Sequence, residues 1–272
     1  MSWKTSIATS AAPTGFGPLL FAGRVAEAVG VAAELRLDGI ELSLRSPHEL
    51  DAAELRRLLD RHGLPLVAVG SGRAYLEDGL CLLAETADER RRAVERVREL
   101  VAYGADFGAP VIVGLLRGQQ PPSREVLARL EESMATCADA AAAYGMPLLL
   151  EAINRYETRL LNTALETVAF VQRLQRPNLR VLLDVFHMNI EEVSLADAVR
   201  DTGALLGHVH IVDSNRRAPG MGHVDYRPIT AALREVGYER WLSAEVLPLP
   251  DDAAAARQVR AFALSLQGAD VQ

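Results

Sequence analysis

Four residues that can ligate a divalent metal each stand at the end of a short apolar segment. Glu151 follows Met-Pro-Leu-Leu-Leu, Asp184 follows Val-Leu-Leu, Glu245 follows Leu-Ser-Ala, and His210 comes directly after a valine. A carboxylate at the end of an apolar strand is costly to desolvate unless a partner compensates, and a divalent cation is a common partner. Three carboxylates and one imidazole, with no thiolate, suit Mn²⁺, Mg²⁺ or Co²⁺ with open positions for substrate oxygens. The sequence therefore predicts one divalent metal.

The spacing of these residues indicates the fold that positions them. There are 33 residues from Glu151 to Asp184, 26 from Asp184 to His210 and 35 from His210 to Glu245. Each interval holds about one strand plus one helix, which is the repeat of a (β/α)8 barrel. Because the strand carboxyl ends of such a barrel meet in one ring, we expect the four side chains to converge there.

Each of these residues has a simpler explanation when it is taken alone. Asp184 could cap the following helix, His210 could be a hydrogen-bonded histidine of the core, and either glutamate could pair with an arginine. These explanations fit single residues better than they fit four ligands at the ends of consecutive strands. We therefore favour the metal site.

Alternating strand and helix patterns run along the chain and predict an α/β fold, a (β/α)8 TIM barrel. The predicted strands are Thr5–Ser10, Gly39–Leu44, Leu66–Gly70, Val111–Leu115, Leu148–Glu151, Val181–Asp184, His208–Val212 and Trp241–Val246. The predicted helices include Ala87–Phe107, Arg124–Tyr144, Thr163–Leu174 and Tyr226–Val236. No Gly-x-Gly-x-x-Gly follows the first strand, so we expect no nucleotide cofactor.

Three connections are longer than a strand-to-helix link requires. They are Ser71–Thr86, Ile153–Asn162 and Val212–Asp225, and each begins at the carboxyl end of a predicted strand. Barrel enzymes build their substrate loops at this end. The three loops therefore predict a substrate pocket over the metal ligands.

Length and charge limit the classes of protein to consider. The 272 residues, 49% of them hydrophobic, predict one barrel domain spanning residues 1–272. The net charge of −7, from 29 basic and 36 acidic residues, argues against nucleic-acid binding. The N-terminal segment lacks the apolar core of a signal peptide, and no segment approaches the roughly 18 apolar residues of a membrane span. We expect a cytoplasmic protein with neither a nucleic-acid nor a membrane partner.

Longer segments surround the candidate ligands. They are Gly-Ser-Gly-Arg-Ala-Tyr-Leu-Glu-Asp-Gly-Leu (70–80), Gly-Leu-Leu-Arg-Gly (114–118), Glu-Ala-Ile-Asn-Arg-Tyr-Glu-Thr (151–158), Asp-Val-Phe-His (184–187), His-Ile-Val-Asp-Ser-Asn-Arg (210–216) and Leu-Pro-Leu-Pro (247–250). These segments resemble the ketose 3-epimerases, the D-tagatose/D-psicose 3-epimerase group of the xylose-isomerase-like barrels. The resemblance covers nearly the whole chain and is greatest to the 5-keto-L-gluconate epimerase branch.

The resemblance implies an epimerase that inverts the carbon next to the keto group of a ketose or keto-aldonate, of the 5-keto-L-gluconate or D-tagatose/D-fructose type. Glu151 and Glu245 would remove and return the proton on opposite faces of a cis-enediolate, besides ligating the metal. Glu157, His187 and Arg216 would bind the substrate. Such chemistry needs a Lewis acid because a proton next to a carbonyl is weakly acidic, and inversion needs an acid and a base on opposite faces. The resemblance also implies a homodimer or homotetramer.

Other functions remain open at this stage. An aldose–ketose isomerase of the hydroxypyruvate-isomerase type would use the same carboxylates and shuttle the proton between C1 and C2. A catalytically silent sugar-binding barrel would keep the ligands without turnover. The related endonuclease IV barrels hold three zinc ions, but the loops after the third and fourth strands of this chain offer no histidine to complete such a cluster.

A keto-aldonate substrate would need a cation for its carboxylate. Arg45, Arg73 and Arg117 occupy loop positions on the face where the strands end. A guanidinium binds a carboxylate through two parallel hydrogen bonds, so each of the three is a candidate for carboxylate binding.

Overall fold

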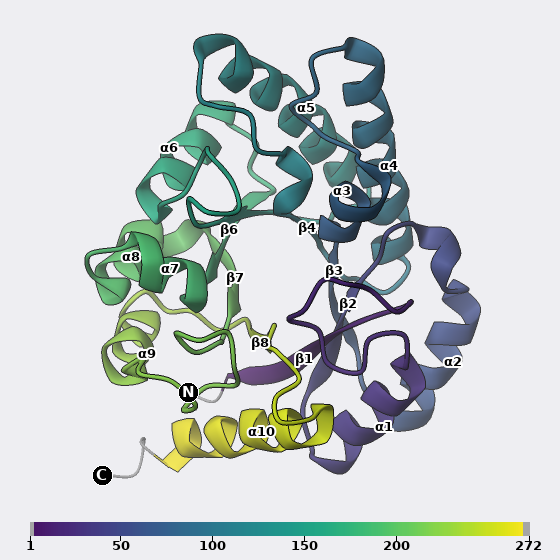
Figure 1. Ribbon diagram of the computed structural model, residues 1–272, viewed down its shortest axis with the longest axis vertical. Helices are drawn as coiled ribbons and strands as arrows, with labels where there is room; N and C mark the ends of the chain where they lie inside the picture. The colour runs from purple at the N-terminus through teal and green to yellow at the C-terminus, as the bar shows by residue number, and fades with distance from the viewer. Residues whose placement is uncertain (1–2, 269–272) are drawn as a thin grey trace.

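A computed structural model describes residues 3–268 and shows a closed barrel in which eight parallel strands follow one another in sequence order (Figure 1). The predicted (β/α)8 barrel is confirmed. Residues 1–2 and 269–272 of the predicted domain lie outside the described residues. The strands are β1 (Lys4–Ser10), β2 (Gly39–Ser43), β3 (Leu66–Gly70), β4 (Val111–Val113), β5 (Leu148–Ala152), β6 (Leu179–Asp184), β7 (Leu206–His210) and β8 (Trp241–Ala244).

Helices surround the barrel and connect successive strands (Figure 1). They are α1 (Val25–Glu34), α2 (Ala52–His62), α3 (Gly72–Asp78), α4 (Ala87–Ala105), α5 (Arg124–Ala142), α6 (Ala164–Leu174), α7 (Val185–Glu191), α8 (Leu195–Thr202), α9 (Tyr226–Glu235) and α10 (Asp252–Gly268), with the 3-10 turns η1 (Pro47–Glu49), η2 (Leu115–Arg117) and η3 (Gly203–Leu205). Across residues 3–268, none of these helices combines the length and the apolar character that crossing a membrane requires.

Side-chain caps explain where several helices begin. Asp51, Thr86, Ser123, Thr163 and Ser194 each accept a hydrogen bond from a backbone N–H in the first turn of the helix that follows. Such caps satisfy N–H groups that have no partner within the helix. Because these polar residues directly precede helical patterns, they set most of the predicted helix starts to within one residue.

Some predicted boundaries are wrong. The fourth strand ends at Val113 rather than Leu115, because the chain turns into η2. The seventh strand is Leu206–His210 rather than 208–212, and the eighth ends at Ala244, so that Glu245 lies one residue beyond it. The predicted loop 71–86 contains the short helix α3.

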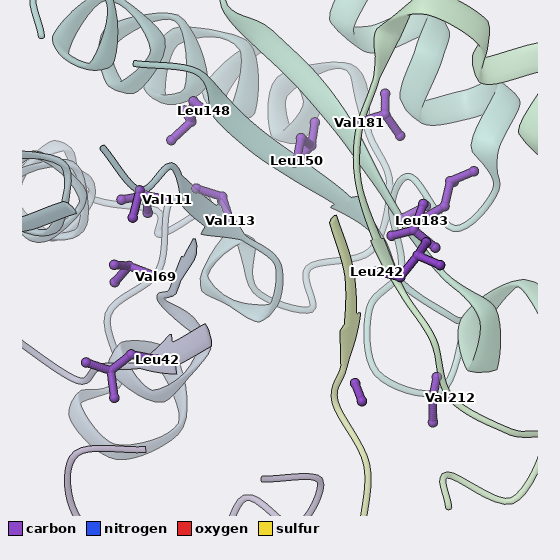
Figure 2. Close-up of a cluster of buried hydrophobic side chains, with 14 of the residues drawn as sticks. Leu42, Val69, Val111, Val113, Leu148, Leu150, Val181, Leu183, Val212 and Leu242 are labelled. Atoms are coloured by element: carbon purple, nitrogen blue, oxygen red, sulfur yellow. The ribbon is translucent and has the colours of Figure 1, made fainter. Parts of the chain in front are cut away.

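Alternate residues of each strand point to opposite faces of the barrel, so one set packs against the helices and the other faces the interior. The side chains that pack outward against the helices form the large hydrophobic cluster of Figure 2, with Leu42, Val69, Leu150, Leu183 and Leu242 among its members. Alternate residues point into the barrel, where Ala68, Ile112, Leu149 and Leu182 form a second, small cluster. Two residues after Leu149 and Leu182 on the same inward face come Glu151 and Asp184. The strand period therefore aims these carboxylates at the barrel axis.

Candidate active site

The four predicted ligands come together at one end of the barrel. Asp184 and His210 are the last residues of β6 and β7 and are partners in the register of those strands. Asp184, His210 and Glu245 each offer a ligand atom within 4.8 Å of the others, and so do Glu151, Asp184 and His187. Asp184 and His210 are buried, and Glu151 is 7% exposed.

Asp184 uses its two carboxylate oxygens differently. Oδ1 accepts hydrogen bonds from the backbone N–H groups of Phe186 at 2.7 Å and His187 at 3.3 Å, and so caps α7. Oδ2 is buried, has no hydrogen bond within residues 3–268, and lies 3.4 Å from Nδ1 of His210. The helix-cap explanation therefore holds for Oδ1, whereas Oδ2 has no hydrogen bond among the described residues, and its role as a metal ligand stays a prediction.

One ring nitrogen of His210 has a hydrogen-bond partner and the other has none among the described residues. Its Nε2 lies 3.1 Å from Oε1 of Glu41 on β2, whereas its Nδ1 is buried with no hydrogen-bond partner among the described residues. Buried polar atoms without a partner are rare, because desolvation without a hydrogen bond is costly. Two such atoms, Asp184 Oδ2 and His210 Nδ1, face each other between two further carboxylates, an arrangement that fits a divalent cation.

The clustering of three carboxylates, Glu151, Asp184 and Glu245, also favours a bound cation. Burial, together with the neighbouring carboxylates, raises the pKa of Glu151 to about 8, and burial likewise raises the pKa of Glu245 to about 7. Burial acts in the same direction on Asp184, but Arg216 and the two nearby histidines outweigh it and lower the pKa of that carboxyl. Three ionised carboxylates would repel one another in this space, so the metal-free site retains protons.

Glu151 is packed from two sides. A Cβ on Gly114 would lie 2.3 Å from Oε2 of Glu151, so only glycine leaves room for this carboxylate. On the other side, the guanidinium of Arg117 donates to the backbone carbonyl of Glu151 and, at 3.3 Å, to the carbonyl of Leu161. These contacts fix the end of β5 and the direction of its carboxylate.

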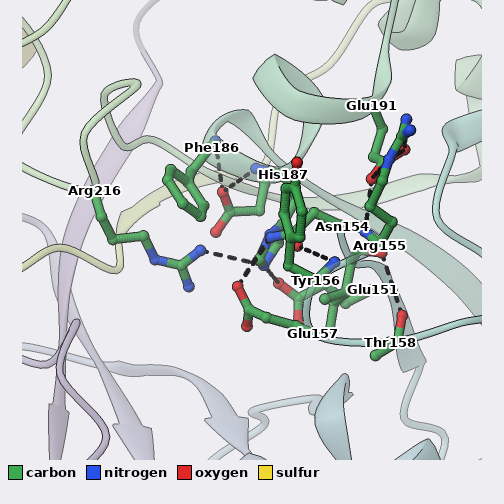
Figure 3. A network of polar contacts seen from close by, with 12 residues as sticks. Glu151, Asn154, Arg155, Tyr156, Glu157, Thr158, Phe186, His187, Glu191 and Arg216 are labelled. Carbon is green, nitrogen blue, oxygen red and sulfur yellow. Dashed lines mark hydrogen bonds and ion pairs between the residues drawn. The ribbon is translucent and has the colours of Figure 1, made fainter. Parts of the chain in front are cut away.

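The loop after β5 supplies a polar network beside the ligands (Figure 3). Asn154 donates through Nδ2 to Oε1 of Glu157 at 2.9 Å and contacts Nδ1 of His187 at 2.7 Å. Nε2 of His187 lies 3.7 Å from Oε1 of Glu151. Glu157 and His187 therefore lie beside the candidate ligands, and their part in substrate binding stays a prediction.

Arg216 closes the site from the loop after β7. Its Nη2 donates to Oε2 of Glu245 at 2.6 Å, its Nη1 lies 3.3 Å from Nε2 of His187, and its guanidinium stacks on the ring of Phe186 at 4.5 Å. The residue is 8% exposed. Arg216 thus links Glu245 to His187.

A pocket opens over these groups. Its lining over the described part of the chain combines the polar site with small and apolar side chains from the first half of the barrel. The lining residues are Phe16, Glu41, Ser43, Gly70, Ser71, Gly72, Ile112, Gly114, Leu115, Glu151, Ile153, Glu157, His187, His210, Arg216 and Glu245. Phe16 and Glu41 were not predicted. Glu41 could have been predicted as a site residue because it is the one charged residue in the apolar strand segment Gly-Ile-Glu-Leu-Ser.

The three arginines predicted to bind a carboxylate do not line this pocket as the structure describes it. Arg73 is 1% exposed, and its guanidinium is occupied by Glu49 and Glu77 at 2.8 to 3.0 Å. Arg117 is fully buried under β5. Arg45 lies on the outer surface beside Asp78. The structure therefore offers no contact that supports this prediction.

Comparison with known proteins agrees with this geometry. A family model described as the xylose isomerase-like TIM barrel matches residues 29–263. An L-ribulose 3-epimerase of Methylomonas sp. is 34% identical over 221 residues, covering 78% of this chain and 74% of the relative. A D-psicose 3-epimerase of Agrobacterium fabrum is 37% identical over 216 residues, covering 76% and 73%. A solved L-ribulose 3-epimerase, 27% identical, superposes with a TM-score of 0.84 and covers 99% of this chain and 96% of that one.

Proposed function

The chain belongs to the xylose isomerase-like TIM barrel family and is a sugar epimerase, and from this premise we propose that it is a metal-dependent ketose 3-epimerase. In this proposal it inverts the carbon next to the keto group by deprotonation and reprotonation through a cis-enediolate. Glu151 and Glu245 are the acid and base.

The order of the four residues around the ring carries this assignment. Three of them come from the consecutive strands β5, β6 and β7, the fourth, Glu245, directly follows β8, and the two glutamates occupy the two ends of this arc. Asp184 and His210 lie between them. A substrate carbon above the middle of the arc would have one glutamate on each side, which is the arrangement that inversion requires.

The group that fits a divalent cation is Glu151, Asp184, His210 and Glu245. When bound there, Mn²⁺, Mg²⁺ or Co²⁺ would supply the positive charge that makes a proton next to a carbonyl removable at neutral pH. Asp184 and His210 would hold the cation only, since one carboxylate oxygen and one ring nitrogen are already committed to other partners.

The chain's own residues would divide the remaining steps. One glutamate takes the proton from the carbon next to the keto group, the other donates a proton to the opposite face, and their roles exchange in the reverse reaction. His187, Arg216 and Glu157 would bind the substrate oxygens. Phe16 and Leu115 would cover the apolar parts of the sugar and restrict water.

A neutral ketose fits the lining better than a keto-aldonate. Arg216 is the arginine that reaches the pocket over residues 3–268, and it is already paired with Glu245. We therefore expect Arg45→Met and Arg117→Met to change KM for 5-keto-gluconate and for D-fructose or D-tagatose by the same factor. A KM increase confined to 5-keto-gluconate would restore the carboxylate-binding prediction.

Incubating the metal-loaded protein with a panel of ketoses in D₂O tests the proposal. Deuterium at C3 supports the epimerase, deuterium at C1 or C2 would establish the isomerase instead, and binding without deuterium would establish a silent barrel. Glu151→Gln and Glu245→Gln should each abolish exchange. Full exchange in either variant would remove that glutamate as the acid or base.

The remaining assignments follow the same proposal. We propose that residues 1–272 form one catalytic domain of a cytoplasmic enzyme that acts as a homodimer or homotetramer. Light scattering coupled to gel filtration would measure the oligomeric state, and a monomer of 29.5 kDa would contradict it.

A further inference from the structure

A buried carboxylate reaches across the barrel interior to the strand that carries His210. Glu41 belongs to β2, whereas the histidines that it contacts belong to β7, and these two strands are not neighbours in the ring. Glu41 is 3% exposed. A carboxylate in such a place is costly unless its oxygens receive hydrogen bonds, and both do.

The two oxygens of Glu41 bind two different histidines. Oε2 lies 2.9 Å from Nε2 of His208, and Oε1 lies 3.1 Å from Nε2 of His210. His208 and His210 are two residues apart on one strand, so both point inward, and their rings meet edge to face at 5.3 Å. Glu41 is therefore held by His208 while it holds His210.

This contact decides which nitrogen of His210 faces the candidate metal site. A histidine must be neutral to ligate a metal, and with Nε2–H donated to Glu41 the lone pair of that neutral ring is on Nδ1. Nδ1 is the buried atom without a hydrogen bond in residues 3–268, 3.4 Å from Oδ2 of Asp184 and 3.9 Å from Oε1 of Glu151. A carboxylate behind a ligating histidine fixes the tautomer and orients the ring.

We propose that Glu41 is a positioning residue of the metal centre: it fixes His210 with Nε2 protonated and Nδ1 presented to the cation, and His208 holds Glu41 in place. The proposal rests on the proposed function to the extent that a cation binds at Glu151, Asp184, His210 and Glu245. Loss of such a positioning partner lowers metal affinity by roughly 10- to 100-fold in comparable sites.

The competing explanation is a second metal site. Glu41, His208 and His210 also offer ligand atoms within 4.8 Å of one another. However, both Nε2 atoms already lie at hydrogen-bond distance from the carboxylate, so a cation would have to break both contacts. The number of ions bound separates the two explanations.

The test is calorimetric titration of Mn²⁺ into the metal-free full chain, comparing wild type with Glu41→Gln. We expect one ion per wild-type chain and a Kd raised about 10- to 100-fold in Glu41→Gln. Glu235→Gln, which removes a surface carboxylate paired with Arg200, is the matched control and should keep the wild-type Kd.

A second readout follows the histidine itself. In histidine-¹⁵N-labelled protein loaded with Zn²⁺, which is diamagnetic, His210 should show metal-bound Nδ1 and a strongly downfield Nε2–H resonance. This proton should move upfield in Glu41→Gln, an effect that a loss of stability elsewhere in the barrel would not produce. If Glu41→Gln does not fold, Glu41→Asp keeps the charge but shortens the side chain by one methylene and should weaken Mn²⁺ binding in the same direction.

The outcomes separate this inference from the proposed function. A wild-type protein that binds no Mn²⁺ would overturn both. One ion in wild type with an unchanged Kd in Glu41→Gln would overturn the role of Glu41 alone. Two ions in wild type and one in Glu41→Gln would also overturn it, because Glu41 would then be a ligand of a second site.

Discussion

The side-chain amide of Asn154 sets the proton position on His187. Oδ1 of Asn154 accepts the backbone N–H of Tyr156 at 2.9 Å, so Nδ2 is the atom that meets Nδ1 of His187 at 2.7 Å (Figure 3). Nη1 of Arg216, also a donor, approaches Nε2 of His187 at the longer distance of 3.3 Å. A neutral ring accepts at one nitrogen only, so the shorter contact favours Nδ1 as the acceptor and Nε2 as the protonated atom. Burial lowers the pKa of His187 to about 3, so the ring is neutral at physiological pH. His187 therefore presents an N–H toward Glu151.

Replacing Asn154 should impair turnover more than folding. Asn154→Leu removes the donor to Nδ1 and releases the ring, and we expect kcat to fall by on the order of 10- to 100-fold, the usual effect of a misplaced binding group. Steady-state kinetics with D-fructose or D-tagatose would measure this change. Tyr156→Phe, which changes an exposed side chain and keeps the same backbone N–H, is the control and should retain wild-type kcat. Unchanged kcat in Asn154→Leu would show that His187 needs no such orientation.

Metal binding should release protons near neutral pH. Burial raises the pKa of Glu151 to about 8 and that of Glu245 to about 7 in the metal-free site, and a cation requires both groups ionised. Mn²⁺ affinity should therefore rise as the pH increases from about 6 to about 8.5, with about one to two protons released per ion at the lower pH. Calorimetry in two buffers of different ionisation enthalpy measures the release, and none at pH 6 would refute the shifts.

The raised pKa values of Glu151 and Glu245 also determine how the stability of the metal-free protein changes with pH. Because the folded-state pKa values are raised, the folded metal-free protein binds more protons than the unfolded chain, and this contribution to stability is lost as the pH rises from the ordinary glutamate pKa of 4.5 to about 7 to 8. The difference in Tm between metal-loaded and metal-free protein should grow over this window. A constant difference would contradict the prediction.

Asp213 should control the loop that carries Arg216. Its carboxylate accepts the backbone N–H groups of Ser214 at 2.7 Å, Gly220 at 2.8 Å and Val224 at 3.1 Å. Burial alone would raise the pKa of Asp213, but these donors lower it, so the stabilisation is present above the ordinary aspartate pKa and is lost as the pH falls below it.

We expect Asp213→Asn to lower the free energy of unfolding by about 1 to 3 kcal/mol at pH 7 and to raise KM, since the loop positions Arg216. Urea unfolding at neutral and at acidic pH would measure this, and the gap between variant and wild type should narrow in acid. Asp88→Asn, on an 85% exposed side chain, should leave stability unchanged.

Gly114 should be irreplaceable for activity. A Cβ at this position would meet Oε2 of Glu151 at 2.3 Å, so Gly114→Ala must displace that carboxylate. We expect kcat to fall by roughly 100-fold, the effect of moving a catalytic group by about 1 Å. Gly30→Ala in α1, where nothing lies within 4 Å of the new Cβ, should leave kcat unchanged. Wild-type kcat in Gly114→Ala would exclude Glu151 as an acid or base in its present position.

The fold and the convergence of the candidate ligands could be predicted from the sequence because both depend on short-range patterns. Glu151, Asp184 and His210 lie at or next to the last residue of apolar strands that recur at intervals of a strand plus a helix, so closure of the barrel brings them together. Glu41 could not be placed in the same way, since its contacts with β7 exist only across the closed interior. Arg73 pairs with Glu77, four residues later, which a predicted helix over this segment would have indicated. Its pairing with Glu49 depends on the tertiary fold and could not be predicted.

The two halves of the chain contribute different parts of the candidate site. The four candidate ligands and the three predicted substrate-binding residues all come from β5 onward, whereas Phe16, Ser43, Ser71 and Leu115 line the pocket from the first half. Glu41 and Gly114 are the first-half residues on which the candidate ligands depend, so they are exceptions to this division. Under the proposed function, mutations at the other wall positions would change which sugars fit and leave the two glutamates in place, so that a new sugar preference could arise in one half of the gene without loss of the reaction.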